Sequence, residues 1–420
     1  MLYNWLETQR ALIRWMDTWA ASLARACGLP AQSPESLAMP GCEWLRRVFK
    51  TTLEPPPFAI ASVTLGGRRV HVDETVVDRV AFCALRRFAR RGEHRARLDG
   101  GAPILLCTPL AGHHAVMLRE TVETLLEDGD VYVTDWANAR DVPLAEGRFG
   151  LDDYVLTVER FMRRLCGNGL HVLAVCQGTV PAIAAAALIA ARGEPAPLSV
   201  TLMGGPIDTR LNPTAVDRLA ATHSIDWFRR TVIDTVPAWY RGGGRRIYPG
   251  YLQHAAIVAA HPHRQMALET RYWTSRLAGD DARIAASRRA FDEYAAVLDM
   301  TEDYFLDTLR IVFKEQRLAR GAWDVDGRRV RGSALAASAL CTIEGDRDDI
   351  TGAGQTHAAH AVCSAVPDRR RKQLTIADCD HYDLFTGPRW REAIHPALAA
   401  FWRETHEPHE PHEPQPAAIS

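Results

Sequence analysis

The sequence predicts an α/β protein in which a mostly parallel β-sheet is joined by crossover helices and interrupted by a helical insertion. Short apolar runs alternate with stretches of helical periodicity, which is the pattern of parallel strands buried on both faces. This alternation stops after residue 203 and resumes near residue 339. The expected strands are Ile104–Cys107, Val131–Thr134, His171–Val175, Leu198–Met203, Ala339–Ile343 and Leu374–Ile376.

An N-terminal region precedes this alternation. Residues 1–27 are expected to form a helix, because apolar residues recur at helical spacing between charged ones. These apolar residues are Trp5, Leu12, Trp15, Trp19 and Leu23. Their face either packs on the body of the protein or contacts a hydrophobic particle. Residues 28–57 are rich in proline and are expected to form an irregular connection.

The core is expected to begin with a β-hairpin over residues 58–64 and 69–72, with Gly66-Gly67 at its turn. Residues 76–91 are basic and are expected to be helical. Further helices are expected over residues 114–127, 151–165, 180–191 and 390–403. These helices supply the crossovers that a parallel sheet requires.

The remaining segments complete the predicted organisation. Residues between the two parts of the sheet are rich in helix formers and aromatic side chains, so they are expected to form a lid. Alternatively, these aromatic side chains form the core of the insertion itself. The C-terminal segment repeats His-Glu-Pro three times and is expected to be disordered, with metal binding as the alternative. The expected segments are 1–57 (N-terminal helix and connection), 58–203 (first part of the core), 204–321 (helical lid insertion), 322–405 (second part of the core) and 406–420 (disordered tail).

Composition narrows the possible partners. Fifty basic and 51 acidic residues give a formal net charge of −1, so no general attraction to nucleic acid is expected. Nine scattered cysteines without a C-x-x-C pair argue against a disulfide framework and against a structural zinc site. The N-terminus lacks the pattern of a signal peptide, and no apolar run is long enough for a transmembrane segment. A cytoplasmic location is therefore expected.

A candidate nucleophile lies in Ala174-Val175-Cys176-Gln177-Gly178, between an apolar strand and an alanine-rich helix. This is the context of a nucleophile elbow, in which a tight turn presents the nucleophile above the sheet and small flanking residues let strand and helix approach closely. The start of the following helix favours negative charge and therefore a thiolate. Alternatively, Cys176 is a buried cysteine that ends a core strand.

Candidate partners of Cys176 follow later strands, in the order that an α/β-hydrolase triad requires. Asp346, Asp348 and Asp349 come directly after one predicted strand, and His381 comes after the next. We expect His381 to take the proton of Cys176, and Asp348 to hold the imidazole in the required tautomer. Asp346 and Asp349 are the competing acids.

An oxyanion hole in this fold uses two backbone N–H groups. One is expected from Gln177, which follows the nucleophile, and the other from the loop over residues 108–114. Gly112 and His113 are the candidates in this loop. The adjacent histidines His113 and His114 alternatively mark an ordinary polar loop end.

Several longer stretches carry a resemblance to a known family. These stretches are Val175–Gln177, Asp135–Arg140, Leu151–Tyr154, Phe291–Asp299 and Glu344–Thr356. They resemble the intracellular polyhydroxybutyrate depolymerases, cysteine-type relatives of the polyhydroxyalkanoate synthases, from the N-terminal helix to about residue 403. By this resemblance Cys176, Asp348 and His381 take the positions of nucleophile, acid and base. The sequence departs from the family beside the base, where Asp380 and Asp383 replace glycines.

The resemblance implies hydrolysis of a water-insoluble polyester through an acyl-enzyme on Cys176, with release of 3-hydroxybutyrate oligomers or monomers. It also implies contact with the surface of polymer granules and no need for a metal or organic cofactor. Two alternatives remain from the sequence: a synthase-like acyltransferase that uses hydroxyacyl-coenzyme A, and a non-catalytic granule-binding protein. Water and coenzyme A are both open as acyl acceptors.

Overall fold

The computed structural model describes residues 2–26, 55–91, 101–260 and 262–406. The strands are β1 (Ser62–Leu65), β2 (Arg68–Val80), β3 (Cys83–Arg90), β4 (Ile104–Cys107), β5 (Val131–Trp136), β6 (His171–Val175), β7 (Ser199–Met203), β8 (Asp234–Thr235), β9 (Arg246–Tyr248), β10 (Met300–Thr301), β11 (Asp324–Val325), β12 (Arg328–Arg329), β13 (Ala339–Gly345) and β14 (Arg371–Ile376). The α-helices are α1 (Leu2–Ala26), α4 (Arg119–Leu125), α5 (Leu151–Leu165), α6 (Thr179–Ala191), α7 (Ala215–Thr222), α8 (Ile225–Thr231), α9 (Gly250–Ala260), α10 (Pro262–Leu277), α11 (Asp281–Ala295), α12 (Glu302–Thr308), α13 (Ala359–Val362), α14 (Gly387–Arg389) and α15 (His395–His406).

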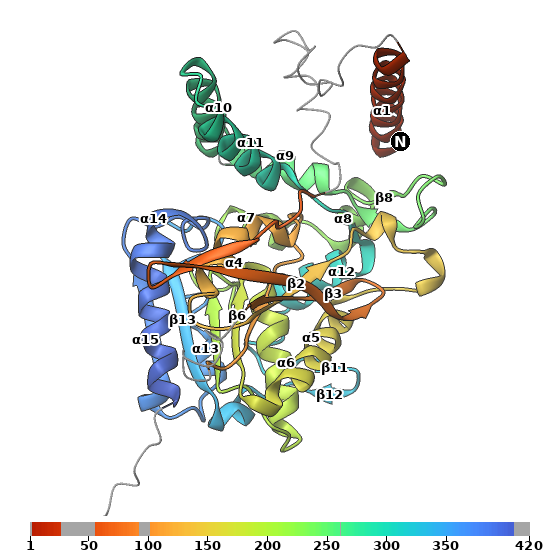
Figure 1. Cartoon of the computed structure of the whole chain (residues 1–420). Helices are drawn as coiled ribbons and strands as arrows, with labels where there is room; N and C mark the ends of the chain where they lie inside the picture. The colour runs from red at the N-terminus through yellow and green to blue at the C-terminus, as the bar shows by residue number, and fades with distance from the viewer. Residues whose placement is uncertain (1, 27–54, 92–100, 261, 407–420) are drawn as a thin grey trace, which may run out of the picture.

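A nine-stranded sheet forms the centre of the molecule, in the order β1-β2-β3-β5-β4-β6-β7-β13-β14 (Figure 1). The pairs from β1 to β5 are antiparallel, and the pairs from β5 to β14 are parallel. From β2 onward, β3 is the single strand that runs antiparallel to the other strands. This strand order and direction are those of the α/β-hydrolase fold. The fold class predicted from the sequence is therefore confirmed.

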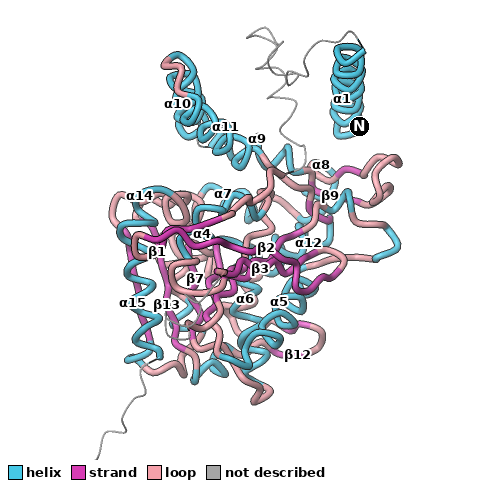
Figure 2. Tube along the Cα trace, in the orientation of Figure 1, coloured by secondary structure: helices cyan, strands magenta, loops and turns pink. Residues whose placement is uncertain are grey.

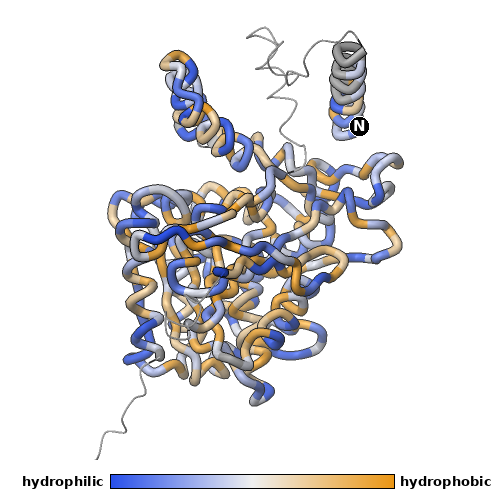
Figure 3. The backbone as a smooth tube through the Cα atoms, viewed as in Figure 1, coloured by the Kyte–Doolittle hydropathy of each residue, from blue (hydrophilic) through white to orange (hydrophobic). Residues whose placement is uncertain are grey.

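Two hydrophobic cores cover the two faces of this sheet. On one face α5 and α6 pack against side chains that include Leu105 and Val172. On the other face α4 and α15 pack against the neighbouring Leu106 and Leu173. Because successive residues of a strand point to opposite faces, a strand buried on both sides needs an uninterrupted apolar sequence. Figure 3 shows hydrophobic residues gathered in the middle of the molecule.

The first strands confirm one prediction and correct another. The hairpin predicted around Gly66-Gly67 is formed by β1 and β2. The helix predicted over residues 76–91 is wrong, because this segment contains the end of β2 and all of β3. Phe82, Leu85 and Phe88 recur every three residues, which imitates helical spacing, and the turn between the strands has no glycine or proline. Pairing of β3 with β2 and β5 outweighs this local signal.

The chain between β7 and β13 leaves the sheet. It contains α7 to α12 together with a small antiparallel sheet of β8, β9 and β10. Helices α10 and α11 form a hairpin that projects from the main body (Figure 2). The role of this insertion as a lid and the boundaries of the five segments stay predictions.

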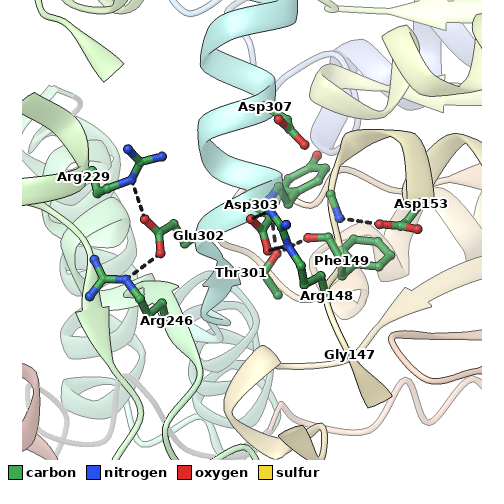
Figure 4. Close-up of polar contacts among 12 residues, drawn as sticks. Gly147, Arg148, Phe149, Asp153, Arg229, Arg246, Thr301, Glu302, Asp303 and Asp307 are labelled. Carbon is green, nitrogen blue, oxygen red and sulfur yellow. Dashed lines mark hydrogen bonds and ion pairs between the residues drawn. The ribbon is translucent and has the colours of Figure 1, made fainter. Parts of the chain in front are cut away.

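The N-terminus of α12 joins this insertion to the core (Figure 4). The hydroxyl of Thr301 donates to the carbonyl oxygen of Phe149 at 2.5 Å. Glu302 accepts hydrogen bonds from Arg229 of α8 at 2.9 Å and from Arg246 of β9 at 2.6 Å. These contacts fix the position of α8 relative to α12.

Helix α1 corresponds to the helix predicted over residues 1–27 and contacts the body through its first turns. Tyr3 and Glu7 are buried, and the hydroxyl of Tyr3 donates to Asp299 Oδ2 at 2.5 Å. Farther along, Trp15 and Trp19 are 63% and 58% exposed. Beyond its first turns α1 stands clear of the main body (Figure 1). The predicted apolar face is therefore largely open to solvent.

Two predictions concern segments that lie outside the residues described by the structure. The irregular connection, apart from residues 55–57, and the disordered tail after residue 406 lie outside the described residues. Within the part of the chain that the structure describes, no helix is both long enough and apolar enough to cross a membrane.

Candidate active site

The turn after β6 has the backbone geometry of a nucleophile elbow. Cys176 has a φ of 51°, a left-handed conformation that residues other than glycine rarely adopt. Residue 178 must be glycine, because a Cβ there would lie 2.8 Å from the carbonyl oxygen of Cys107. The turn leaves Cys176 partly exposed, whereas the other described cysteines are buried.

Three side chains that the sequence predicted to act together meet at one edge of the sheet. Cys176, Asp348 and His381 follow β6, β13 and β14, whose carboxyl ends share this edge. His381 Nδ1 lies 2.7 Å from Asp348 Oδ2, and His381 and Cys176 line the same cavity. The structure thus assembles a Cys–His–Asp constellation, whose catalytic role is a proposal.

Asp348 is held in place by the backbone on its other side. Its Oδ1 accepts the N–H groups of Ile350 at 3.0 Å and Thr351 at 2.8 Å. The side chains of Asp348 and His381 are only 2% and 4% exposed, so their hydrogen bond is shielded from water. Such a buried, charge-assisted hydrogen bond fixes the orientation of the imidazole and leaves Nε2 for Cys176.

Opposing effects act on the pKa of His381. Burial would lower this pKa, but the charges of Asp348 and Cys176, together with the hydrogen bond to Asp348, raise it well above its ordinary value. The imidazole therefore favours its protonated form. An imidazolium beside Cys176 can give its proton to a leaving group.

The two competing carboxylates have different surroundings. Asp346 accepts a hydrogen bond from the backbone N–H of Cys379 at 3.2 Å and so supports the turn before His381. Asp349 is exposed at the surface. Of the three carboxylates, Asp348 is the one that makes a hydrogen bond with His381.

The departures from the family pattern beside His381 have a structural role. Asp380 Oδ1 accepts the backbone N–H groups of Tyr382 at 2.8 Å and Asp383 at 2.9 Å. Burial, followed by the charge of Asp380, raises the pKa of Asp383. A carboxylate at position 380 therefore shapes the loop that carries the base, where a glycine would leave these N–H groups without this acceptor.

The oxyanion-hole candidates lie at different places. Gln177 and His113 line the same cavity as Cys176. Gly112 has a φ of 97° and lies so close to Gln253 that a Cβ would be 2.7 Å from Gln253 Cδ. Which backbone N–H groups would bind an oxyanion stays a prediction.

An apolar cavity of about 380 Å³ opens beside Cys176 and His381. None of the described residues that line it is an Asp, Glu, Lys or Arg. Burial lowers the pKa of His113 and of His114 to about 3, so both of these lining imidazoles are neutral. The apolar lining from the insertion includes Val216, Leu219, Trp227, Phe228, Ile257 and Phe305. This cavity suits an uncharged aliphatic ligand.

Tyr304 supports the nucleophile turn but was not among the residues predicted from the sequence. Tyr304 of α12 is buried, and its hydroxyl donates to Gln177 Oε1 at 3.0 Å. The one local signal is that Tyr304 lies three residues after Thr301, whose hydroxyl accepts its backbone N–H at 3.3 Å as the helix cap. The contact of Tyr304 with Gln177 depends on how the insertion packs against the core, and no sequence motif indicates this packing.

Strand order and site geometry together define an α/β hydrolase with a cysteine at the nucleophile elbow. Residues 204–406 match the family model described as PHB de-polymerase C-terminus. Over these residues, the resemblance to polyhydroxybutyrate depolymerases stated from the sequence is confirmed.

Solved structures with a similar overall fold include several lipases and esterases. A monoacylglycerol lipase from Paleococcus ferrophilus has 11% identity and a TM-score of 0.42, covering 72% of this chain and 94% of the lipase. An esterase from Thermogutta terrifontis has 13% identity and a TM-score of 0.43, covering 80% and 100%. Among curated proteins, none matches the chain. The fold assignment rests on the strand order of the chain itself.

Proposed function

We propose that the protein hydrolyses polyesters of the poly(3-hydroxybutyrate) type, with Cys176 as covalent nucleophile. The observation that carries this proposal is the buried, hydrogen-bonded Asp348–His381 pair, which shares an apolar cavity with Cys176. The match of residues 204–406 to the PHB depolymerase family supports an ester hydrolase and the polymeric substrate.

The proposed reaction has two halves. The thiolate of Cys176 attacks an ester carbonyl carbon, and the tetrahedral intermediate collapses as the carbon–alkoxide bond breaks. The imidazolium of His381 gives its proton to that alkoxide, which leaves as an alcohol. A water molecule then gives a proton to His381 and attacks the thioester, so that the carbon–sulfur bond breaks and a hydroxy acid is released.

Hydrolysis is favoured over the acyltransferase alternative by the cavity lining. A hydroxyacyl-coenzyme A substrate carries several phosphate charges, which proteins usually bind with Arg, Lys or helix N-termini. The described residues that line the cavity include no Arg or Lys. The aliphatic polyester has no charge along its chain and suits this lining.

Association with polymer granules is part of the proposal. Trp5, Trp15 and Trp19 of α1 are each more than half exposed, and apolar surface of this kind usually marks an interaction site. The protein would then act at the granule surface in the cytoplasm, with α1 as one contact. The alternative of a non-catalytic granule-binding protein lacks a reason for the buried Asp348–His381 pair.

The decisive experiment is incubation of the purified protein with amorphous poly(3-hydroxybutyrate) granules while acid release is followed. Cys176→Ala is the matched control, since it removes the thiol and little else. Acid release by the parent and none by the variant supports the proposal. Binding to granules without acid release would instead support the non-catalytic alternative, and consumption of hydroxyacyl-coenzyme A would support the acyltransferase.

A further inference from the structure

Three apolar side chains meet solvent at the rim of the cavity. Val216, Leu219 and Trp227 are 44%, 51% and 37% exposed, and each also lines the cavity that holds Cys176 and His381. The first two lie on α7 and the third on α8, which follows directly in the chain. Exposed apolar side chains that continue into a cavity combine a surface for contact with a path to the nucleophile.

The rim is held in a defined position. The ring of Trp227 lies 4.0 Å from that of His223 and 5.0 Å from that of Phe228, measured between centroids. Phe228 packs with Leu306 and Leu309 in a small buried cluster. The rim therefore rests on α12 and the turns that follow it rather than on a loose loop.

A polar contact strengthens this connection. Arg229, two residues after Trp227, binds Glu302 at the start of α12 (Figure 4). The same helix carries Tyr304, whose hydroxyl contacts the side chain of Gln177. The rim and the nucleophile turn are thus both attached to α12, which keeps the path between them in one arrangement.

We propose that Val216, Leu219 and Trp227 form the entrance through which a single polyester strand passes from the polymer to Cys176. This inference rests on the proposed function. A polyester strand is the expected ligand of this entrance because the apolar surface continues into the cavity. The side chains at the surface are the same ones that line the cavity leading to Cys176. The described residues that line the cavity include no Arg or Lys that would attract a phosphate or an acidic peptide. Methyl and methylene groups of the polyester gain free energy when such a surface removes them from water.

The test uses the variant Leu219→Ser with Trp227→Ser and substrates of graded length. We expect the parent kcat/KM to rise with the number of repeats in soluble 3-hydroxybutyrate oligomers, because added repeats reach the rim. In the variant this dependence should flatten, and hydrolysis of amorphous polymer should fall about tenfold or more. The rate for the polymer should fall by a larger factor than the rate for a two-carbon acyl ester, which does not reach the rim.

Trp239→Ser with Met266→Ser is the matched control, since these side chains are 58% and 67% exposed and do not line the cavity. This control should keep the parental length dependence. Thermal unfolding of each variant is measured in parallel. If the double rim variant unfolds at a clearly lower temperature, Leu219→Gln replaces it, because Trp227 then stays on His223.

The outcomes distinguish failure of the proposed entrance from failure of the proposed function. A rim variant with the parental length dependence, or with a short-ester rate that falls in step with the polymer rate, overturns the entrance. The proposed entrance is also overturned if the Trp239 and Met266 control loses its length dependence together with the rim variant. A parent that hydrolyses the short ester but neither oligomers nor polymer overturns the polyester function, and the entrance with it.

Discussion

Replacing Asp348 by Asn keeps the size of the side chain and removes its charge. In the structure Asp348 Oδ1 accepts two backbone N–H groups, while Oδ2 accepts from His381 Nδ1 at 2.7 Å. An Asn side chain has one acceptor oxygen. When that oxygen stays on the two backbone donors, its NH₂ group faces Nδ1. The neutral imidazole then carries its proton on Nε2, where it cannot accept a proton from water.

The size of the effect follows from this change of tautomer. In Ser–His–Asp hydrolases the same change costs about 10⁴-fold in kcat, which equals about 5 kcal/mol of transition-state free energy. The assay is steady-state hydrolysis of a soluble short ester, so that polymer binding does not enter. Asp349→Asn is the control, because Asp349 is exposed, and it should be close to the parent. Near-parental activity of Asp348→Asn, or an equal loss in the control, would refute the assignment.

The same variant has a predicted pH signature. Burial lowers the pKa of His381, but Asp348 and Cys176 more than compensate and raise it above the ordinary 6.5. A group whose pKa is raised by folding stabilises the folded state fully below its unfolded pKa, and this contribution is lost as the pH rises through the folded pKa. The difference in unfolding free energy between the parent and Asp348→Asn should therefore be largest near pH 6 and shrink at alkaline pH. Denaturant titrations at several pH values measure it, and a difference that grows with pH contradicts the argument.

Three further predictions concern other parts of the molecule. Iodoacetamide should label Cys176 ahead of the other described cysteines, which are buried, and peptide mapping that finds equal labelling elsewhere would contradict this preference. Cys176→Ala should lose several orders of magnitude in turnover. Trp5→Ser with Trp15→Ser should weaken sedimentation with granules, but leave short-ester hydrolysis and thermal stability unchanged, because these side chains are 56% and 63% exposed; parallel losses would show a packing role instead. Gly178→Ala should destabilise the fold by about 1–3 kcal/mol, because its Cβ would meet the Cys107 carbonyl oxygen, and unchanged denaturant stability would contradict this.

Local signals explain which parts of the fold were predictable. Strands β4 and β6 were found because each is a short apolar run, and every residue of both is buried. Residues 76–91 were misassigned because the spacing of Phe82, Leu85 and Phe88 suits a helix, and only the neighbouring strand β5 decides otherwise. The sequence could not decide whether the apolar face of α1 is exposed or packed on the protein, since both interpretations require the same apolar spacing.

The candidate site was predictable to a similar degree. Cys176, Asp348 and His381 could be proposed because each follows a strand, and parallel strands end at the same edge of the sheet. The contact of Tyr304 with Gln177 and the rim around Trp227 were not predictable. Both depend on how a long insertion packs back on the core, which local periodicity does not encode.

The absence of Asp, Glu, Lys and Arg from the described lining of the cavity also affects the release of product. The substrate is a neutral ester, but its hydrolysis product is a carboxylate at neutral pH. Apart from the His381 imidazolium, which is already paired with Asp348, the described lining offers this anion no cation, whereas water solvates it well. Each bond cleaved thus converts a ligand that the cavity prefers into one that the solvent prefers. Under the proposed function, this difference in solvation favours release of the acid and leaves the apolar cavity free for the next repeat of the polyester.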